Sequence, residues 1–295
     1  TSYSIGSNWY RPTNIFILPD GYIVFGTYYG TYNDTWMMKL DTAGQPVWSQ
    51  NYSGSFDVIT QVPGGFAMAS TTGSGVSDHD MLVRLMDLDG QVQLSKRYDT
   101  NLDAVRSMAV SSGTLAILGP VTAAGSASDI RAFGIDANGN MSWEYTFDGG
   151  YNDSAASIRA ASDGGFIVGA NTDINESNKG VVLLKLGLTG VLQWQKVYPD
   201  KIIPNDHDTL RSVSGGDYIV GVRSNPSQLN TFELIKTDSS GSCSTLDSPS
   251  AMISSLSEST ITDYVESSGG GDPTYLWNST SYQFGGYVEI EQIYP

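Results

Sequence analysis

Residues that commonly carry out catalysis are few in this chain. The only two histidines, His79 and His207, each stand between aspartates in a polar stretch. A histidine in such a setting can join a metal site, but a solvated loop histidine explains the same pattern. No Ser-His-Asp signature, phosphate-binding glycine loop or zinc motif is present. We therefore expect a protein that is not an enzyme.

Calcium is the one cofactor for which the sequence offers a set of ligands. Oxygen donors alternate along residues 173–180, as they do in calcium loops, and the candidate ligands are Asp173, Asn175 and Ser177. The stretch lacks the distal bidentate glutamate of an EF-hand. No other cofactor is expected.

Three arginines fall in segments expected to line the central channel of the fold derived below. Arg106, Arg159 and Arg211 would bind an anion if their guanidinium groups converged there. In the alternative, they pair with acids of the neighbouring loops and join adjacent repeats: Asp103, Asp153 and Asp208.

Those acids also raise the possibility of an enzyme. A glycosidase would need two or three carboxylates at the mouth of such a channel. Aspartates recur just before the expected first strands, at Asp57, Asp103, Asp153 and Asp208. Because they recur in four of the five repeats, they indicate a turn device rather than an acid and a base with different roles.

These residues are carried by a repeat of about fifty residues. The clearest element is a turn that closes on glycine, at Gly44, Gly90, Gly139, Gly190 and Gly241, so that the glycines fall 46, 49, 51 and 51 residues apart. In four of the five turns aspartate stands three residues earlier, where its side chain can bond backbone N–H groups, and glycine accepts a positive φ. A four-stranded antiparallel unit of this length is the size of a propeller blade.

Apolar runs before each turn predict the second and third strands. The second strands are expected at residues 22–26, 66–70, 114–119, 166–170 and 218–222, and their continuous apolarity predicts burial on both faces. Third strands are expected at, among others, residues 36–40, 181–186 and 232–236. Lys39, Lys185 and Lys236 recur in them, but the second repeat has Leu85.

Each fourth strand has a large side chain four residues before an aromatic one. The pairs are Trp48 with Tyr52, Leu94 with Tyr98, Trp143 with Phe147, and Trp194 with Tyr198. This spacing places both side chains on one face of a strand. Since a ligand site would not need renewal in every repeat, we expect these residues to pack between adjacent blades.

The fourth repeat, residues 163–170 with 181–198, resembles the secreted bacterial and archaeal β-propeller repeats that read D-G-G-[YF]-I and then L-x-K-L-D-x-x-G-x-x-x-W-x-K-x-Y. The other four repeats match more loosely, and the resemblance covers residues 1 to about 243. It implies the fold, whereas propellers of this kind serve many functions.

The strand count predicts how the chain is closed. After Gly241 the expected fourth strand is missing, while Tyr3 precedes Gly21 by the 18 residues that separate Tyr198 from Gly216. We therefore expect an all-β, five-bladed propeller over residues 1–243 whose last blade is completed by residues 1–5. The alternative is six blades, with the sixth drawn from the C-terminal extension, residues 244–295.

Composition indicates an exported protein. Acids outnumber Lys and Arg by 31 to 15, which gives a net charge of −16 and argues against nucleic acid and anionic membranes as partners. No apolar run is long enough to span a bilayer. The first residue is not methionine, and we expect that an N-terminal segment has been cleaved. Asn-x-Ser/Thr sequons are candidate glycosylation sites: Asn33, Asn51, Asn140, Asn152, Asn175 and Asn278.

We expect an extracellular or cell-surface protein that acts as a structural or adhesive module. In its extension, residues 287–294 alternate like a strand, and Tyr287, Val288, Ile290 and Tyr294 are the candidate residues for self-assembly by strand addition to a neighbouring subunit, which repeated head to tail gives a filament. The alternatives are a glycan-binding lectin, since tyrosines and tryptophans are frequent, and a glycoside hydrolase.

Overall fold

The computed structural model describes residues 9–29, 33–72, 79–122, 127–175, 178–204, 209–224, 232–243, 257–259 and 281–283. The chain falls into two compact units, Thr1–Ser244 and Thr245–Pro295. In the second unit the described residues are the paired strands β21 (Ser257–Ser259) and β22 (Ser281–Gln283). The assembly candidates at 287–294 lie outside the described residues.

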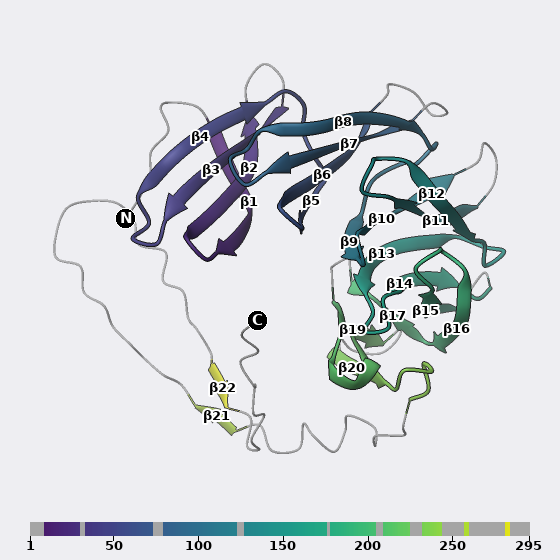
Figure 1. The fold of residues 1–295 in the computed structure, drawn as a ribbon. Helices are drawn as coiled ribbons and strands as arrows, with labels where there is room; N and C mark the ends of the chain where they lie inside the picture. The colour runs from purple at the N-terminus through teal and green to yellow at the C-terminus, as the bar shows by residue number, and fades with distance from the viewer. Residues whose placement is uncertain are drawn as a thin grey trace. The chain divides into compact units, whose positions relative to one another are not determined.

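The first unit consists of five antiparallel sheets of four strands, confirming the predicted all-β propeller blades (Figure 1). In blades 1 to 4 the strands follow one another in sequence order. Blade 1 is β1 (Trp9–Leu18), β2 (Gly21–Tyr29), β3 (Asn33–Asp41) and β4 (Pro46–Tyr52). Blade 2 is β5 (Val58–Val62), β6 (Gly65–Thr72), β7 (Asp80–Asp87) and β8 (Val92–Asp99). Blade 3 is β9 (Ser107–Ser111), β10 (Thr114–Thr122), β11 (Ser128–Ile135) and β12 (Met141–Phe147).

The last two blades continue the series with one irregularity. Blade 4 is β13 (Asp153–Ala160), β14 (Phe166–Asp173), β15 (Lys179–Leu186) and β16 (Leu192–Pro199). Blade 5 is β17 (Lys201–Ile202), β18 (Leu210–Ser212), β19 (Tyr218–Ser224) and β20 (Phe232–Thr237). Both β17 and β18 pair with one edge of β19 and together form the first strand, while β20 pairs with the other edge. No described strand pairs with the outer edge of β20, and residues 1–5 lie outside the described residues, so closure of the ring stays a prediction.

The hydrophobic core lies between consecutive blades. Each of four clusters of buried side chains draws on two neighbouring sheets; for example, Phe25 and Met37 of blade 1 pack with Phe66 and Met68 of blade 2. The second strands of blades 2, 3 and 4 are buried on both faces, as their unbroken apolar sequence predicted. In β2 of blade 1 one face is only half-buried, at Tyr22 and Val24. A smaller cluster around Trp36 belongs to blade 1 alone.

The turn between the third and fourth strands has the predicted geometry. Asp87, Asp136 and Asp238 each accept hydrogen bonds on Oδ1 from backbone N–H groups two and four residues later, at 2.8 to 3.0 Å. All five closing glycines have φ between +75° and +77°. Directly after each described turn in blades 1 to 4, the fourth strand has a one-residue irregularity in register just before its Trp or Leu. Such bulges aim a side chain, and here they set the large residue against the next blade.

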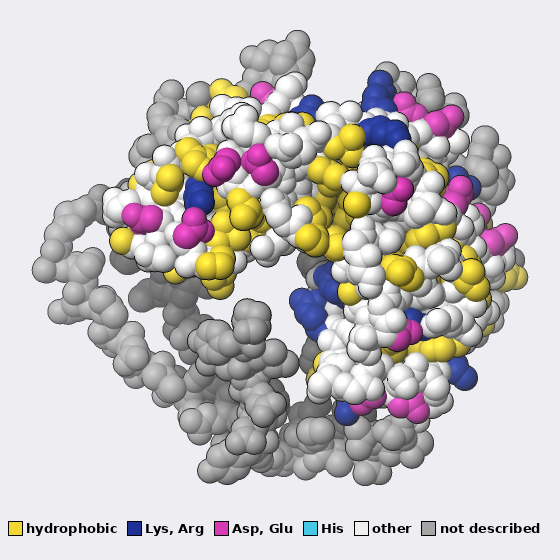
Figure 2. Space-filling model, viewed as in Figure 1, with side chains coloured by type: hydrophobic (Ala, Val, Ile, Leu, Met, Phe, Trp, Pro, Cys, Tyr) yellow, Lys and Arg dark blue, Asp and Glu magenta, His cyan; other side chains and the backbone are white. Residues whose placement is uncertain are grey.

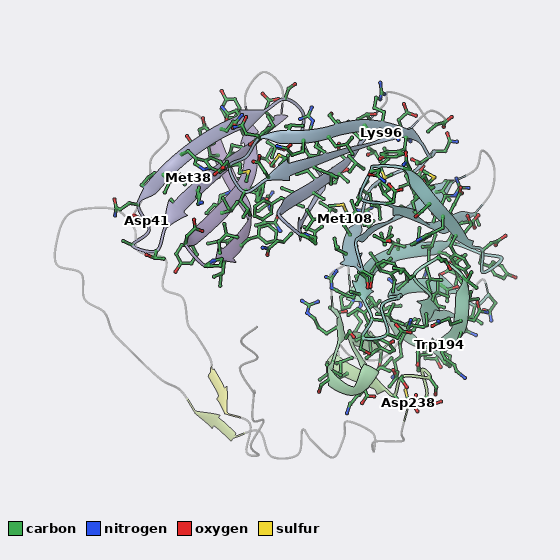
Figure 3. The ribbon with its side chains drawn as sticks, in the orientation of Figure 1. Met38, Asp41, Lys96, Met108, Trp194 and Asp238 are labelled. Carbon is green, nitrogen blue, oxygen red and sulfur yellow. The ribbon has the colours of Figure 1, made fainter. Side chains whose placement is uncertain are left out.

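These turns require glycine for a second reason: a side chain at this position would collide with the preceding blade. An added Cβ at Gly190 would lie 2.5 Å from Cε3 of Trp143 in the preceding blade, and at Gly241 it would lie 2.6 Å from Cζ3 of Trp194. Gly90 faces Trp48 and Gly139 faces Leu94 in the same way. Figure 3 labels Trp194 and Asp238, the first residue of the turn that this indole covers; Nε1 of Trp194 donates to the carbonyl of Ser239 at 3.1 Å.

A hydroxyl group completes three of these contacts. Tyr52, Tyr98 and Tyr198 donate to the carbonyl oxygens of Gly90, Gly139 and Gly241 in the next blade, at 2.6, 2.8 and 2.6 Å. Burial, followed by the negative charge of Asp87, raises the pKa of Tyr52 to about 12. Blade 3 has Phe147 in place of the tyrosine, and there the contact is apolar. The prediction that the fourth-strand residues pack between blades is therefore confirmed.

Replacing Gly190 by alanine tests whether the indole contact demands glycine. Gly113→Ala is the matched control, because Gly113 also has a positive φ (+80°) but has nothing within 4 Å of an added Cβ. Gly113→Ala should cost about 1–2 kcal/mol for the backbone conformation alone. Gly190→Ala should cost about 1–3 kcal/mol more, because the methyl group displaces Trp143. If urea denaturation shows that both substitutions lower the free energy of unfolding equally, Trp143 moves aside without cost and the contact does not require glycine.

Candidate functional site

The predicted anion site separates into two parts. Arg159 on β13 and Arg211 on β18 occupy equivalent register positions, opposite Ile167 and Ile219. Nη1 of Arg159 donates to the carbonyl of Ile158 at 2.7 Å and to Oγ of Ser107 at 3.4 Å. Burial, followed by the positive charge of Arg211, lowers the pKa of Arg159 to about 10. These two arginines therefore lie near each other on neighbouring first strands.

Arg106 has a different environment. It precedes β9, and its backbone N–H donates to Leu118, whereas Ala109 holds the register position equivalent to Arg159. The charge of Arg106 lowers the pKa of Asp57, although burial dominates and the net shift is upward. Nη1 of Arg211 donates to the carbonyl of Leu210 at 2.8 Å.

The recurring aspartates before the first strands serve the blade itself. Oδ2 of Asp57 accepts from the backbone N–H of Thr71 at 3.2 Å, and Oδ2 of Asp103 accepts from the hydroxyl of Thr122 at 2.7 Å. Asp153 lies beside Thr172 at the same place in blade 4, and Asp208 lies outside the described residues. Each described aspartate is thus tied to the end of the second strand, as expected of a turn device.

The predicted calcium ligands have internal partners. Oδ1 of Asp173 forms an ion pair with Nζ of Lys179 at 2.6 Å, and Oδ1 of Asn175 accepts from the backbone N–H of Asn178 at 3.0 Å. Ser177 and His207 lie outside the described residues. Nδ1 of His79 lies 3.9 Å from Oδ1 of Asp103.

The sequons that can be placed lie at the surface. Asn51, Asn140, Asn152 and Asn175 are exposed. Asn33 begins β3, but its side chain is not described, and Asn278 lies outside the described residues. The amide of Asn140 donates to Asp136 at 3.3 Å and the oxygen of Asn152 accepts from Ser128 at 3.3 Å.

A polar pocket of about 220 Å³ lies beside the junction of blades 4 and 5. The backbone of Ile203 and the side-chain amide of Asn171 join the blades by two hydrogen bonds, of 2.7 and 3.1 Å. Arg223 also lines the pocket, and its buried Nε has no hydrogen-bond partner among the described residues. Three residues of its lining were singled out from the sequence for other reasons: Asn152, Asp153 and Asp173. The pocket itself was not predicted, because its residues come from two repeats and from the interrupted first strand of blade 5.

A second, apolar pocket of about 200 Å³ lies between blades 2 and 3. Leu85, Leu94, Val110 and Leu115 contribute to its lining. Leu94 holds the position at which the fourth strands of blades 1, 3 and 4 carry tryptophan, and Leu85 replaces the lysine of blades 1, 4 and 5. The pocket is therefore the space that an indole fills at the other interfaces.

Leu94→Trp tests whether this space is a packing gap. The indole should fill the pocket over Gly139 and stabilise the protein by about 0.5–2 kcal/mol, the usual gain from filling a cavity. Leu94→Ala, which enlarges the pocket, should destabilise it. Denaturant titration of the three proteins gives the free energies of unfolding. Destabilisation by Leu94→Trp would show that the gap does not accept the residue found in the other blades.

The described residues include no helix with the length and apolar character needed to cross a bilayer. On the face drawn in Figure 2, Lys and Arg side chains (dark blue) lie in small separate groups among Asp and Glu (magenta).

Known proteins resemble this chain in fold alone. No family model and no curated protein matches the sequence. The β-propeller domain of the trilobed protease from Pyrococcus furiosus, described as having an open velcro topology, is similar with a TM-score of 0.51 and 11% identity over 85% of this chain and 74% of that one. The cobalt-substituted apocarotenoid oxygenase of Synechocystis has a TM-score of 0.47 and 11% identity over 74% of this chain. The match covers 55% of the oxygenase, so this chain spans about half of its length.

Proposed function

We propose that this propeller is a non-catalytic structural or adhesive module of the cell surface or the extracellular space, related to secreted bacterial and archaeal propeller repeats. One observation carries the proposal. The side chains that resemble functional residues in the sequence are occupied in the fold: fourth-strand tyrosines donate to the next blade, and the turn aspartates accept from backbone N–H groups of their own turns. The residues that recur from repeat to repeat therefore maintain the fold.

The acidic composition supports a role outside nucleic-acid binding. A net charge of −16 with 16% charged residues leaves a surface that repels phosphate backbones and other acidic chains. Exposed sequons in blades 1, 3 and 4 offer acceptor sites for glycans in an exported protein. Both features fit a protein displayed to the outside.

Self-association through the extension is the assembly mode that we propose. The full chain should sediment as an assembly at high concentration, whereas a chain ending at Ser244, the last residue of the first compact unit, should sediment as a monomer. If both chains sediment as monomers at the highest workable concentration, residues 245–295 have no role in assembly. Val288→Asp in the full chain tests the same strand with a single substitution. It should reduce self-association, because it places a charge on the face expected to be apolar.

Glycan binding is the alternative function, and the polar pocket at blades 4 and 5 favours it. Sugars present hydroxyl groups to polar side chains and C–H faces to apolar ones, and this pocket combines Arg223 and Asn171 with Ile202 and Ile203. A lectin would bind on a glycan array and lose binding in Arg223→Ala, but not in Arg97→Ala on blade 2. An array without signal for the parent protein would leave the structural role as the supported one.

A further inference from the structure

Three carboxylates from two blades converge at the loop that joins blade 3 to blade 4. Asp129 is the second residue of β11, Asp148 follows β12, and Asp153 begins β13. One ligand oxygen from each lies within 4.8 Å of the other two. Asp148 is exposed, Asp129 is half-buried and Asp153 is buried.

Asp153 has an oxygen without a hydrogen-bond donor. Asp153 is 2% exposed, and its Oδ2 accepts from the backbone N–H of Gly149 at 2.8 Å. The hydroxyl of Thr172 lies close enough to lower the pKa of Asp153. Oδ1 nevertheless has no hydrogen bond of ordinary geometry among the described residues, although it is itself buried. Leaving a buried charged oxygen unpaired is costly, and such an oxygen indicates a missing cationic partner.

The cluster also lacks a neutralising charge. Among the described residues, no Lys or Arg forms an ion pair with any of the three aspartates. Burial and the charge of Asp148 raise the pKa of Asp129, and the charge of Arg131 only partly opposes them. The Nε of Arg131 pairs with Glu144 at 3.3 Å. Burial raises the pKa of Asp153 most, and the charges of Asp129 and Asp148 raise it further.

In blade 2 the acid equivalent to Asp129 has an arginine partner that blade 3 lacks. There Asp80, the counterpart of Asp129 at the start of the third strand, pairs with Arg97 at 3.1 Å. Arg97 precedes Tyr98 on β8, and the residue that precedes Phe147 on β12 is Thr146. Blade 3 therefore keeps the acid and lacks the arginine.

We propose that Asp129, Asp148 and Asp153 bind one calcium ion. Ligands at about 2.3–2.6 Å from a common calcium ion lie up to about 5 Å apart, whereas the ligands of magnesium lie within about 4.2 Å of one another. Three carboxylates supply the negative charge of a calcium site, and water completes the six to eight ligands that calcium takes. The ion gives Oδ1 of Asp153 a partner and ties β11 to β13 across the blade junction.

Calorimetric titration and thermal melting of the full chain, after treatment with a chelator, test this site. Calcium should bind with a stoichiometry of one at this cluster and raise Tm by roughly 5–10 °C at a concentration about 100-fold above Kd. Asp129→Asn and Asp148→Asn should each weaken binding by at least about 10-fold, since calcium affinity depends on ligand charge. In chelator, Asp129→Asn should melt at or above the parent temperature, because it relieves repulsion. If Asp129 served only to hold the fold together, Asp129→Asn would instead melt below the parent temperature in chelator.

The controls are Asp80→Asn in blade 2 and Asp173→Asn in the loop predicted from the sequence, and both should keep the calcium response of the parent. The proposal is overturned if the parent shows neither heat nor a shift in Tm, or if Asp129→Asn and Asp148→Asn respond to calcium as the parent does. It is equally overturned if magnesium raises the Tm of every variant as much as calcium does, since general charge screening then explains the effect.

Discussion

The propeller depends on the contact between one large side chain and one glycine at each blade junction. A turn with φ near +76° presents a residue without Cβ, and the fourth-strand Trp or Leu of the preceding blade covers it. A tyrosine hydroxyl then closes three of the four described junctions by donating to the glycine carbonyl. Because the turn, the bulge and the strand all come from one repeat, each blade brings both halves of the contact.

The repeated lysine shows how far the sequence alone could lead. Lys39, Lys185 and Lys236 on the third strands pair with acids of the turn between the first two strands, at 2.8, 2.8 and 3.4 Å. The blades with Leu85 and Gly134 at this position have no acid in that turn. Lys185 is almost fully buried and also donates to Leu186 and Gln193. The lysine was visible as a repeat, but its partner acid lies across the second strand, in a turn earlier in the chain, so the pairing emerged only from the fold.

Strands and turns were predictable because each is a local property of one repeat. Apolar periodicity and the Asp and Gly of the turns identified the second, third and fourth strands of blades 1 to 4. Sites formed between repeats were not predictable in the same way. Asp129 and Asp153 belong to different blades, and Asp148 lies in a loop with no counterpart in the motif. Arg106 looked equivalent to Arg159 and Arg211 by position along the chain, yet a difference in register separates it from them.

The junction contacts all run in one direction, from a fourth strand to the turn of the following blade. Gly90, Gly139, Gly190 and Gly241 are consequently buried, whereas Gly44, in blade 1, has no described fourth strand of a preceding blade against it and is half-exposed. In such an array the free energy is a sum of blade terms and nearest-neighbour terms, so cooperativity is only as strong as the weakest junction. With leucine and a pocket where the other described junctions have tryptophan, the junction of blades 2 and 3 lacks one large side-chain contact. We expect this junction to separate first under force or heat, so that the segments on either side of it lose their structure separately.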